Sequence, residues 1–433
     1  MKKTLRVGLI GFGMIGKVHA YCYAALPYYA PDLGVSGKIV AVATNGSETA
    51  KRAKETIGCE CATTNYRDIV DDPDIDVVHV CSPNAEHLPH LLGAIAANKH
   101  VYCEKPIVAN AKDAAALREA LGRRDERGEP AYRGVSQVAF HLRGFTAIKR
   151  AKELIDEGRL GQIVQYRVGY YHSSSTSPLA PFRWKHDSDG GTILDLGSHL
   201  FDLIDYLVGL PEELIASATT LVARRPTRAL QPSDALDAAE TRAVLSEDSV
   251  SILTRGLDAA SRAKRVPARA TSAIYEYPPN ARCEERDVMP LAVADSRDRG
   301  ALSGVIEATK TTTGAEDELR LEINGTRGSL RFNLMNPHYL EYYDAESAPG
   351  VYGGEAGWRL IPSGGRYSSP ESEFPSPKST QGWARAHVSS LATFYRSIEL
   401  GRALGPDFSQ ALRVQDALES VKRSVKTRAW ERV

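Results

Sequence analysis

The sequence lacks the features that mark several classes of protein. Its six cysteines include no CxxC pair, so we expect reduced, structural thiols. Lysine plus arginine and aspartate plus glutamate balance at 54 each, so neither nucleic acid nor an anionic membrane surface is an expected partner. No stretch reaches the ~20 apolar residues that a membrane-spanning helix requires. We therefore expect a cytoplasmic protein with no membrane contact.

What is present is an ordinary globular composition. The chain has 433 residues, of which 42% are hydrophobic and 25% charged, and this is enough for two domains with substantial cores. Through about the first third, short apolar runs alternate with helical patterns, which is typical of βαβ units and a parallel sheet. Ligands of such sheets bind at the carboxyl ends of the strands, and we expect a crevice there.

A glycine-rich stretch, GFGMIG at residues 11–16, directly follows the apolar run LRVGLI. In a dinucleotide-binding turn, Gly11 would allow the sharp bend, Gly13 the approach of a pyrophosphate, and Gly16 close helix packing. An ordinary turn between strand and helix is the alternative, since GxGxxG alone is a weak signal. Its position favours a Rossmann dinucleotide-binding domain over residues 1–140, with further cofactor contacts from Phe12, Met14 and Ile15.

After residue 140 the pattern changes to one helix, a set of strand-like runs and two closing helices. We predict an α+β domain over residues 141–433 with a large, mainly antiparallel open sheet. Such a sheet leaves one apolar face to cover, which favours a homo-oligomer. Residues 230–270 are predicted to be a helical insertion, because Leu236, Ala239 and Ala243 have helical spacing. It could be a lid, a subunit contact or a surface excursion.

Several separate stretches resemble the Gfo/Idh/MocA family of sugar and polyol oxidoreductases. They include the glycine-rich turn, CSPNAEH at residues 81–87, CEKPI at residues 103–107 and DLGSH at residues 195–199. The EKP motif followed by DxGxH is far more specific than the glycines, and the resemblance covers nearly the whole chain. It implies NAD(P)-dependent oxidation, with the nicotinamide end of the cofactor near Ser82, Pro83, Asn84, His87, Glu104 and Lys105.

The expected chemistry needs a base for the hydroxyl proton and a cation beside the developing alkoxide. Lys105 would project into the crevice, and Asp195 and His199 are four residues apart, so the carboxylate could orient the imidazole from one helix face. Each residue could instead have a purely structural role, such as a buried contact between strand and helix or a carboxylate that stabilises a helix N-terminus. A zinc site is disfavoured, because no third and fourth ligand with suitable spacing appears.

The choice of cofactor rests on the segment after the second predicted strand. An acidic residue there would bind the adenosine ribose, and a basic residue would accept a 2′-phosphate. This chain has Thr44 and Asn45 at that place, which can hydrogen-bond either form, while Lys51 and Arg52 fall further into the next helix. We expect NAD, with NADP possible.

The substrate is expected to be a small sugar or glycoside. Sugars present apolar faces and hydroxyl edges, which aromatic and polar side chains recognise together. Within the family, the late strand patterns resemble the branch that oxidises inositols, anhydrosugars and glycosides, and a sugar or glycoside 3-dehydrogenase is our prediction. An inositol dehydrogenase and a non-catalytic NAD(P)-binding regulator are the alternatives. Besides the three catalytic candidates, the substrate-binding candidates are Arg143, Tyr171, His172, Arg183, Trp184 and Lys185.

Overall fold

The computed structural model describes residues 3–231, 234, 239–257, 302–347, 353–367, 374–376, 378–380 and 382–433. Cys283 and the parts of the predicted insertion at 232–233, 235–238 and 258–270 lie outside the described residues. The other five cysteines are free thiols. No helix in the described part of the chain is both long and apolar enough to cross a membrane.

The N-terminal domain is built on a six-stranded parallel sheet with strand order β3-β2-β1-β4-β5-β6. The carboxyl half of β1 is buried, as expected for a strand covered on both faces. This order confirms the predicted Rossmann fold. The strands are β1 (Lys3–Ile10), β2 (Val35–Ala43), β3 (Cys61–Thr63), β4 (Val77–Val80), β5 (His100–Cys103) and β6 (Ser136–Val138). The helices are α1 (Met14–Tyr29), α2 (Ser47–Ile57), α3 (Arg67–Val70), α4 (His87–Ala96) and α5 (Ala111–Gly122).

The second half forms a nine-stranded sheet with order β16-β15-β14-β13-β7-β12-β11-β8-β17. Strands β7 and β12 run parallel, and every other neighbouring pair is antiparallel, which confirms the predicted sheet type. The predicted hairpin joins β13 to β14. The strands are β7 (Ile163–Tyr171), β8 (Glu213–Thr219), β11 (Ser249–Arg255), β12 (Ser303–Thr309), β13 (Glu318–Gly325), β14 (Gly328–Asn333), β15 (Tyr339–Asp344), β16 (Trp358–Pro362) and β17 (Glu431–Arg432).

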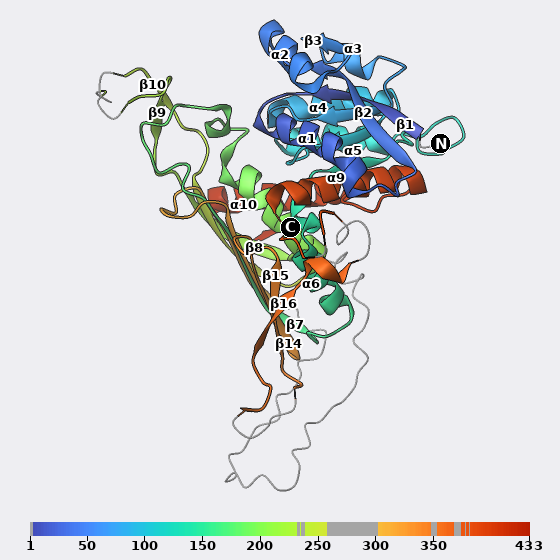
Figure 1. Cartoon of the computed structure of the whole chain (residues 1–433). Helices are drawn as coiled ribbons and strands as arrows, with labels where there is room; N and C mark the ends of the chain where they lie inside the picture. The colour runs from blue at the N-terminus through green and yellow to red at the C-terminus, as the bar shows by residue number, and fades with distance from the viewer. Residues whose placement is uncertain are drawn as a thin grey trace, which may run out of the picture.

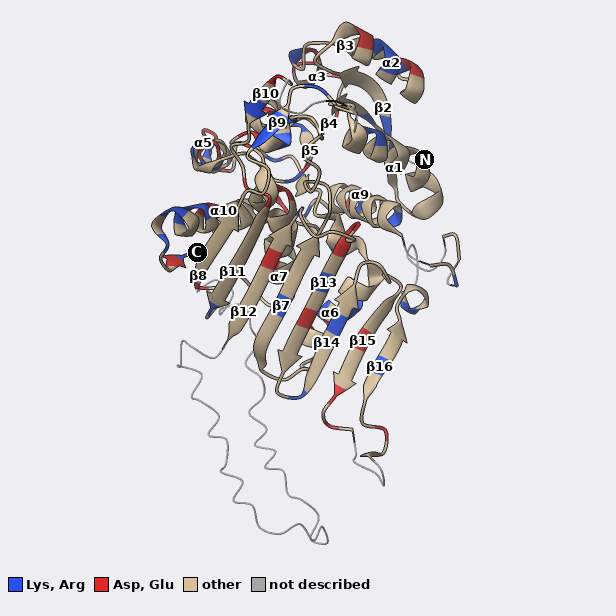
Figure 2. Ribbon diagram, turned by 90° about the vertical axis from the view of Figure 1, so that its left-hand side faces the viewer, with Lys and Arg blue, Asp and Glu red and all other residues tan. Residues whose placement is uncertain are grey.

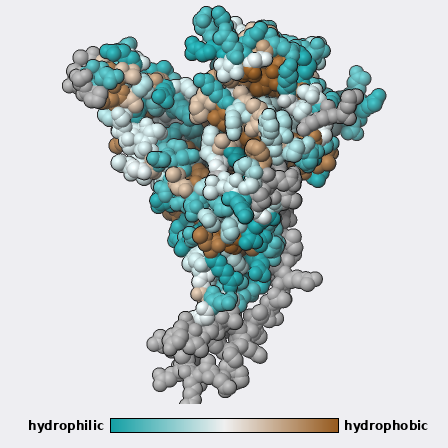
Figure 3. All heavy atoms as spheres, viewed as in Figure 1, coloured by the Kyte–Doolittle hydropathy of each residue, from teal (hydrophilic) through white to brown (hydrophobic). Residues whose placement is uncertain are grey.

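Helices cover one face of this large sheet (Figure 1). They are α6 (Thr146–Asp156), α7 (Ser198–Leu207) and α10 (Phe408–Thr427). Figure 2 shows the opposite face with its strands side by side in front of α6 and α7. Leu253 of β11 is 54% exposed there, and space-filling shows apolar residues in scattered patches on a mostly hydrophilic side of the molecule (Figure 3). That a second subunit covers the open face stays a prediction.

Helix α9 (Trp383–Leu400) returns from the second half of the chain to the N-terminal domain, where it lies along α1 (Figure 1). Its Leu391, Phe394 and Tyr395 belong to the apolar core around β1 and α1. A boundary drawn at residue 140 assigns this helix to the second domain, although its buried face packs in the first. The two halves are therefore joined by shared packing as well as by the chain.

The expected helical insertion is wrong for the residues that the structure describes. Between 239 and 257 the chain forms β10 (Thr241–Ala243) and β11, and β10 pairs with β9 (Arg224–Pro226) in a separate two-stranded sheet. Ala243, one of the helically spaced residues, is in that strand. The spacing of these residues suggested a helix, but pairing with a partner strand decides the local structure.

Candidate active site

The glycine-rich turn has the geometry that a pyrophosphate requires. Gly11 has φ +96, and a Cβ there would lie 2.5 Å from the carbonyl oxygen of Cys81. A Cβ on Gly16 would lie 2.4 Å from the carbonyl oxygen of Gly11, so only glycine permits this approach. At Gly13, the N-cap of α1, no described atom beyond its chain neighbours lies within 4 Å of an added Cβ. The open space in front of the free N–H groups of α1 fits a bound dinucleotide.

The other residues of this turn do not contribute their side chains equally. Phe12 and Ile15 pack against the apolar core of the N-terminal domain, so backbone groups are what they can offer a cofactor. Met14 is 71% exposed. At the end of β2, the Thr44 hydroxyl lies 2.7 Å from that of Thr49 and donates to the carbonyl of Gly46, while Asn45 is exposed. Neither residue brings a fixed charge to the adenosine end.

The segment after β4 is held by contacts to both domains. Asn84 donates to the carbonyl oxygen of Asp189 at 2.9 Å, which ties this segment to the second half of the chain. His87 is fully buried, and its two ring nitrogens lie 2.9 Å from the carbonyl oxygens of Ser82 and Pro106. His87 therefore supports the crevice from inside instead of lining it, whereas Ser82 is half-buried and Pro83 is exposed.

Lys105 is the second residue after the end of β5, and its peptide bond to Pro106 is cis. Its Nζ donates to the carboxylate Oδ1 and to the carbonyl oxygen of Asp195, each at 2.8 Å. The preceding Glu104 is buried, accepts from the Lys105 backbone N–H at 3.1 Å, and lies 2.7 Å from Nε2 of His19. This network fixes Lys105 so that it reaches across from the first domain to the second.

Three lysines converge on the one carboxylate of Asp195. Lys105 contacts Oδ1, while Nζ of Lys185 and of Lys310 lie 2.8 Å and 3.0 Å from Oδ2. Burial alone would raise the pKa of Asp195, but the three ammonium groups outweigh it and hold the pKa well below the usual range. We call Asp195 with Lys105, Lys185 and Lys310 the carboxylate–lysine group. Its carboxylate is ionised at neutral pH.

Asp195 and His199 lie on consecutive helical segments. Asp195 is in η4 (Ile193–Gly197), a π-helical turn, and His199 is in the first turn of α7. The lysine contacts engage both oxygens of Asp195, and Nδ1 of His199 is buried with no hydrogen-bond partner among the described residues. The expected orientation of the imidazole by Asp195 is therefore wrong as a direct hydrogen bond. Burial, assisted by Lys105, holds the pKa of His199 well below its usual value, so the ring is neutral.

On β7, Tyr170 faces the candidate active site, whereas the predicted residue is its neighbour Tyr171. Tyr170 faces His199, with ring centroids 6.0 Å apart, and donates to Asp317 at 2.6 Å. Tyr171 points to the other face of the sheet, where its hydroxyl donates to Glu307. Side chains alternate along a strand, so a one-residue error reverses the face. His172 lies on the same side as Tyr170, with Nε2 3.1 Å from Asp317.

Arg143 does not join this site. It forms a bidentate contact with the buried Asp202, at 2.9 and 2.6 Å, and its guanidinium stacks on Tyr206. Burial raises the pKa of Asp202 to about 6 against the opposing effect of Arg143. Arg183 and Trp184 are exposed on the loop before Lys185. Of these three consecutive residues, Lys185 contacts Asp195.

Sequence reasoning missed Lys310, which follows β12 and is 8% exposed. It also missed a buried histidine cluster formed by His19, His79, His141, His199 and His387. His141 stacks on His387 with a centroid distance of 4.0 Å, and its ring lies 5.0 Å from that of His199. The histidines of this cluster come from separate segments, so their spacing along the chain does not predict the cluster. The one available sign is that His141 and His387 each occur among mostly apolar or small residues.

Two groups in and around this cluster could offer ligands to a metal: His19 with His79 and Cys81, and His19 with Glu104 and His387. Their ligand atoms lie within 4.8 Å of one another in each group. The spacing of residues along the sequence predicts neither group, because the members of each group come from separate segments. In the second group, the contact between His19 and Glu104 already engages one atom of each residue. The absence of a bound metal stays a prediction.

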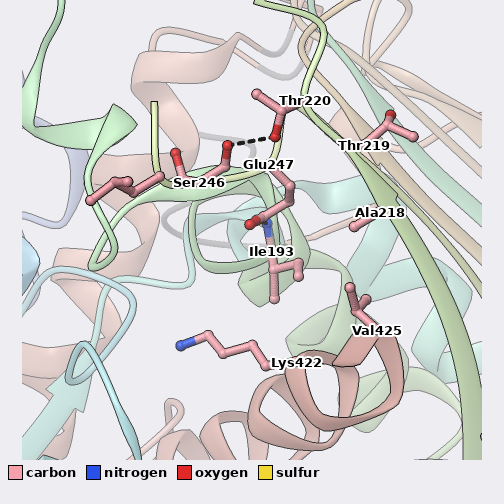
Figure 4. A pocket seen from close by; sticks show the side chains of 9 residues that line it. Ile193, Ala218, Thr219, Thr220, Ser246, Glu247, Lys422 and Val425 are labelled. Carbon is pink, nitrogen blue, oxygen red and sulfur yellow. Dashed lines mark hydrogen bonds between the residues drawn. The ribbon is translucent and has the colours of Figure 1, made fainter. Parts of the chain in front are cut away.

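A separate pocket of 270 Å³ adjoins the start of η4 (Figure 4). Glu247 accepts from the backbone N–H of Ile193 at 2.6 Å, and the two side chains lie together in the figure. Burial raises the pKa of Glu247. This contact anchors the first residue of the π-helical turn that carries Asp195. The pocket is therefore lined by the two residues whose contact holds the start of η4, and Asp195 follows in the same turn.

Comparison with known proteins agrees with this architecture. Residues 5–129 match the oxidoreductase family with an NAD-binding Rossmann fold, residues 148–331 the GFO/IDH/MocA C-terminal domain, and residues 300–433 the oxidoreductase family C-terminal alpha/beta domain. Levoglucosan dehydrogenase of Pseudarthrobacter phenanthrenivorans is 28% identical over 434 residues, covering 99% of this chain and 98% of the relative.

Two further matches extend the comparison. A solved structure of levoglucosan dehydrogenase with NADH and levoglucosan superposes with a TM-score of 0.81 at 26% identity, covering 100% of each chain. The NADP-dependent scyllo-inositol 2-dehydrogenase IolW of Bacillus subtilis is 32% identical over 219 residues, which is 49% of this chain and 54% of the relative. With family matches over nearly its whole length, the chain belongs to the Gfo/Idh/MocA family of oxidoreductases, and its N-terminal domain is an NAD-binding Rossmann fold.

Proposed function

We propose that this protein oxidises a secondary hydroxyl of a sugar or glycoside, at carbon 3, with NAD as hydride acceptor. The observation that carries the proposal is the contact between Lys105 and Asp195, at 2.8 Å, with the neutral imidazole of His199 one helical turn further along the chain. Besides burial, Lys105, a cation of one domain, lowers the pKa of His199, the candidate base of the other, and this effect supports the proposal. The similarity to an anhydrosugar dehydrogenase over the full chain supports the substrate class.

Each of the three residues has a distinct task in this proposal. His199 accepts the hydroxyl proton, for which its lowered pKa keeps the ring unprotonated. Lys105 donates to the developing alkoxide and is held in place by Asp195 and by the Glu104 network. Asp195 is the positioning anion of the site. When bound, NAD supplies a hydride acceptor at the carboxyl ends of the strands.

The nucleotide would be held by the turn at Gly11 and Gly13 and the N-terminus of α1. Thr44 and Asn45 offer no cation to a 2′-phosphate, which favours NAD over NADP. The similarity to an NADP-dependent relative over 49% of this chain keeps NADP as the alternative to be measured.

An inositol dehydrogenase is the second candidate, supported by the 32% identity to a scyllo-inositol dehydrogenase over half of the chain. The test is cofactor reduction, followed at the absorbance of NADH, with levoglucosan, methyl β-D-glucoside and myo-inositol, each with NAD and with NADP. Reduction with a sugar and a 3-oxo product support the proposal. Faster turnover of myo-inositol supports the alternative. No reduction with these compounds or with sugar acids and sugar phosphates indicates a nucleotide-binding regulator.

Variants separate the roles of the three residues. His199→Ala should lower kcat by roughly 10² to 10⁴ while NAD affinity stays near the parent value, because the base is lost and the nucleotide site is not. The acid limb of the parent pH profile should lie below pH 6.5, since only the unprotonated ring accepts a proton and its pKa is lowered. Lys105→Ala should also lower kcat steeply, with partial recovery in Lys105→Arg. If His199→Ala keeps the parent kcat and acid limb, His199 is not the base.

A further inference from the structure

The carboxylate–lysine group has an excess of positive charge. One carboxylate faces three ammonium groups, and Lys105 and Lys310 have side chains that are only 14% and 10% exposed. Ammonium groups held away from water are costly unless hydrogen-bond acceptors surround them. Three further acids, Glu104, Glu247 and Asp317, act electrostatically on Lys105 or Lys310. Among the described residues, Asp195 is the carboxylate that the three lysines contact directly.

The donors of these lysines are only partly used by Asp195. An ammonium has three N–H groups. Lys105 uses two of them on Asp195, whereas Lys185 and Lys310 each make one contact with Oδ2. A single developing alkoxide calls for one cation, and Lys105 serves it in the proposed reaction. Within the part of the chain that the structure describes, two ammonium groups therefore face the same site with N–H groups that Asp195 does not use.

Lys185 is the more exposed of these two lysines, and the buried Lys310 lies beside it at the carboxylate of Asp195. Lys185 is in η3 (Trp184–His186), a short 3-10 helix, and its side chain is 41% exposed. Lys310 follows β12, whose end lies beside the end of β7 because Thr309 pairs with Tyr171. Lys310 is thus next to the segment that carries Tyr170 and His172. Their shared contact with Oδ2 brings both cations to one side of Asp195.

We infer that the substrate carries an anionic group, a carboxylate or a phosphate. Lys185 and Lys310 bind this group together, while Lys105 donates to the oxygen of the reacting hydroxyl. The inference rests on the proposed oxidation and narrows its substrate class to sugar acids or sugar phosphates. An anion there would accept the remaining N–H donors and balance the excess charge, and charge-assisted hydrogen bonds are the strong ones.

The experiment compares matched ligands by titration calorimetry on the full chain with NADH present. D-Glucose is the neutral reference, D-glucuronate and D-gluconate carry a carboxylate at opposite ends of the carbon chain, and D-glucose 6-phosphate carries a phosphate. At least one anion should bind about tenfold or more tightly than glucose. Which anion binds distinguishes a carboxylate from a phosphate. Equal binding of glucose and all three anions would overturn the inference.

Variants of Lys185 test whether the lysines cause the preference for anionic over neutral ligands. Lys185→Met should bring the ratio of anion to glucose affinity close to one, and Lys185→Arg should retain part of the preference for the anion. Lys38→Met is the matched control, because Lys38 is exposed and contacts one carboxylate, Glu60, at 3.2 Å in the N-terminal domain. A preference that survives Lys185→Met refutes the role of the lysine pair.

The same ligands, tested with NAD for turnover, separate this inference from the proposed function. Oxidation of neutral sugars without any preference for the anions overturns the inference and leaves the function standing. Selective binding of the anions without reduction of NAD or NADP by any sugar supports the anion site and contradicts the function.

Discussion

The buried histidine cluster predicts a steep loss of stability in mild acid. Burial is the main cause that holds the pKa values of His79, His141, His199 and His387 well below the ordinary value of 6.5. In the unfolded chain these rings titrate near 6.5. Below that pH the unfolded state binds more protons than the folded state, so the free energy of unfolding falls as pH falls. Above it, the contribution is fully present.

The size of the effect follows from this difference in proton binding. At pH 5.5 an unfolded histidine is about 90% protonated. A ring that remains neutral in the folded protein therefore lowers the free energy of unfolding by about 1 kcal/mol between pH 6.5 and pH 5.5. These four rings of the cluster amount to about 4 kcal/mol, which is a large share of the 5 to 15 kcal/mol typical of a folded protein.

Urea unfolding at pH 7.5, 6.5 and 5.5 measures this loss. The variant His387→Gln removes one titrating ring and leaves an uncharged side chain, so it should reduce the loss of stability between pH 6.5 and pH 5.5 by about 1 kcal/mol. Tyr102→Phe is the control, because Tyr102 touches the same cluster and bonds Ser390 but does not titrate in this range. It should lower stability equally at each pH. A pH dependence that is absent in the parent, or undiminished in His387→Gln, refutes the reasoning.

Three further predictions test the cofactor and metal assignments. Gly13→Val should abolish NAD binding in calorimetry while the circular dichroism spectrum stays that of the parent protein. The space beyond the Cα of Gly13 is open in the fold but is needed for the pyrophosphate. Undiminished NAD binding would contradict this role of the turn. Thr44→Asp should raise the ratio of kcat/KM with NAD to that with NADP by repelling a 2′-phosphate, and an unchanged ratio places this residue away from the adenosine ribose. Metal analysis of the purified protein should find less than one equivalent of any transition metal, and chelation should leave activity unchanged; a stoichiometric metal bound through His19, Glu104 and His387 would reverse the prediction.

Local sequence patterns predicted the frame of the site well. The spacing of Gly11, Gly13 and Gly16 after an apolar strand is a local property, and so is the step from Asp195 to His199 along one segment. The change from alternating βαβ patterns to strand-rich patterns likewise predicted both sheets. These features are fixed within a few residues of chain and do not depend on which strands become neighbours.

The contacts that depend on distant neighbours could not be predicted. Lys310 reaches Asp195 because β12 runs parallel to β7 in the middle of an otherwise antiparallel sheet, and no local signal specifies that pairing. Tyr170 and not Tyr171 faces His199 because the sheet register decides which face is buried. Arg143 is bound by Asp202, a partner 59 residues away along the chain.

Hydride transfer from carbon 3 is the central claim, and isotope labelling tests it most directly. The sugar of the panel that supports the fastest reduction is prepared with deuterium at carbon 3 and incubated with the protein and unlabelled NAD. The proposed reaction predicts that the NADH gains one mass unit and that kcat shows a primary isotope effect if hydride transfer limits turnover. Unlabelled NADH formed at the parent rate would contradict the claim, because the hydride would then have come from another carbon.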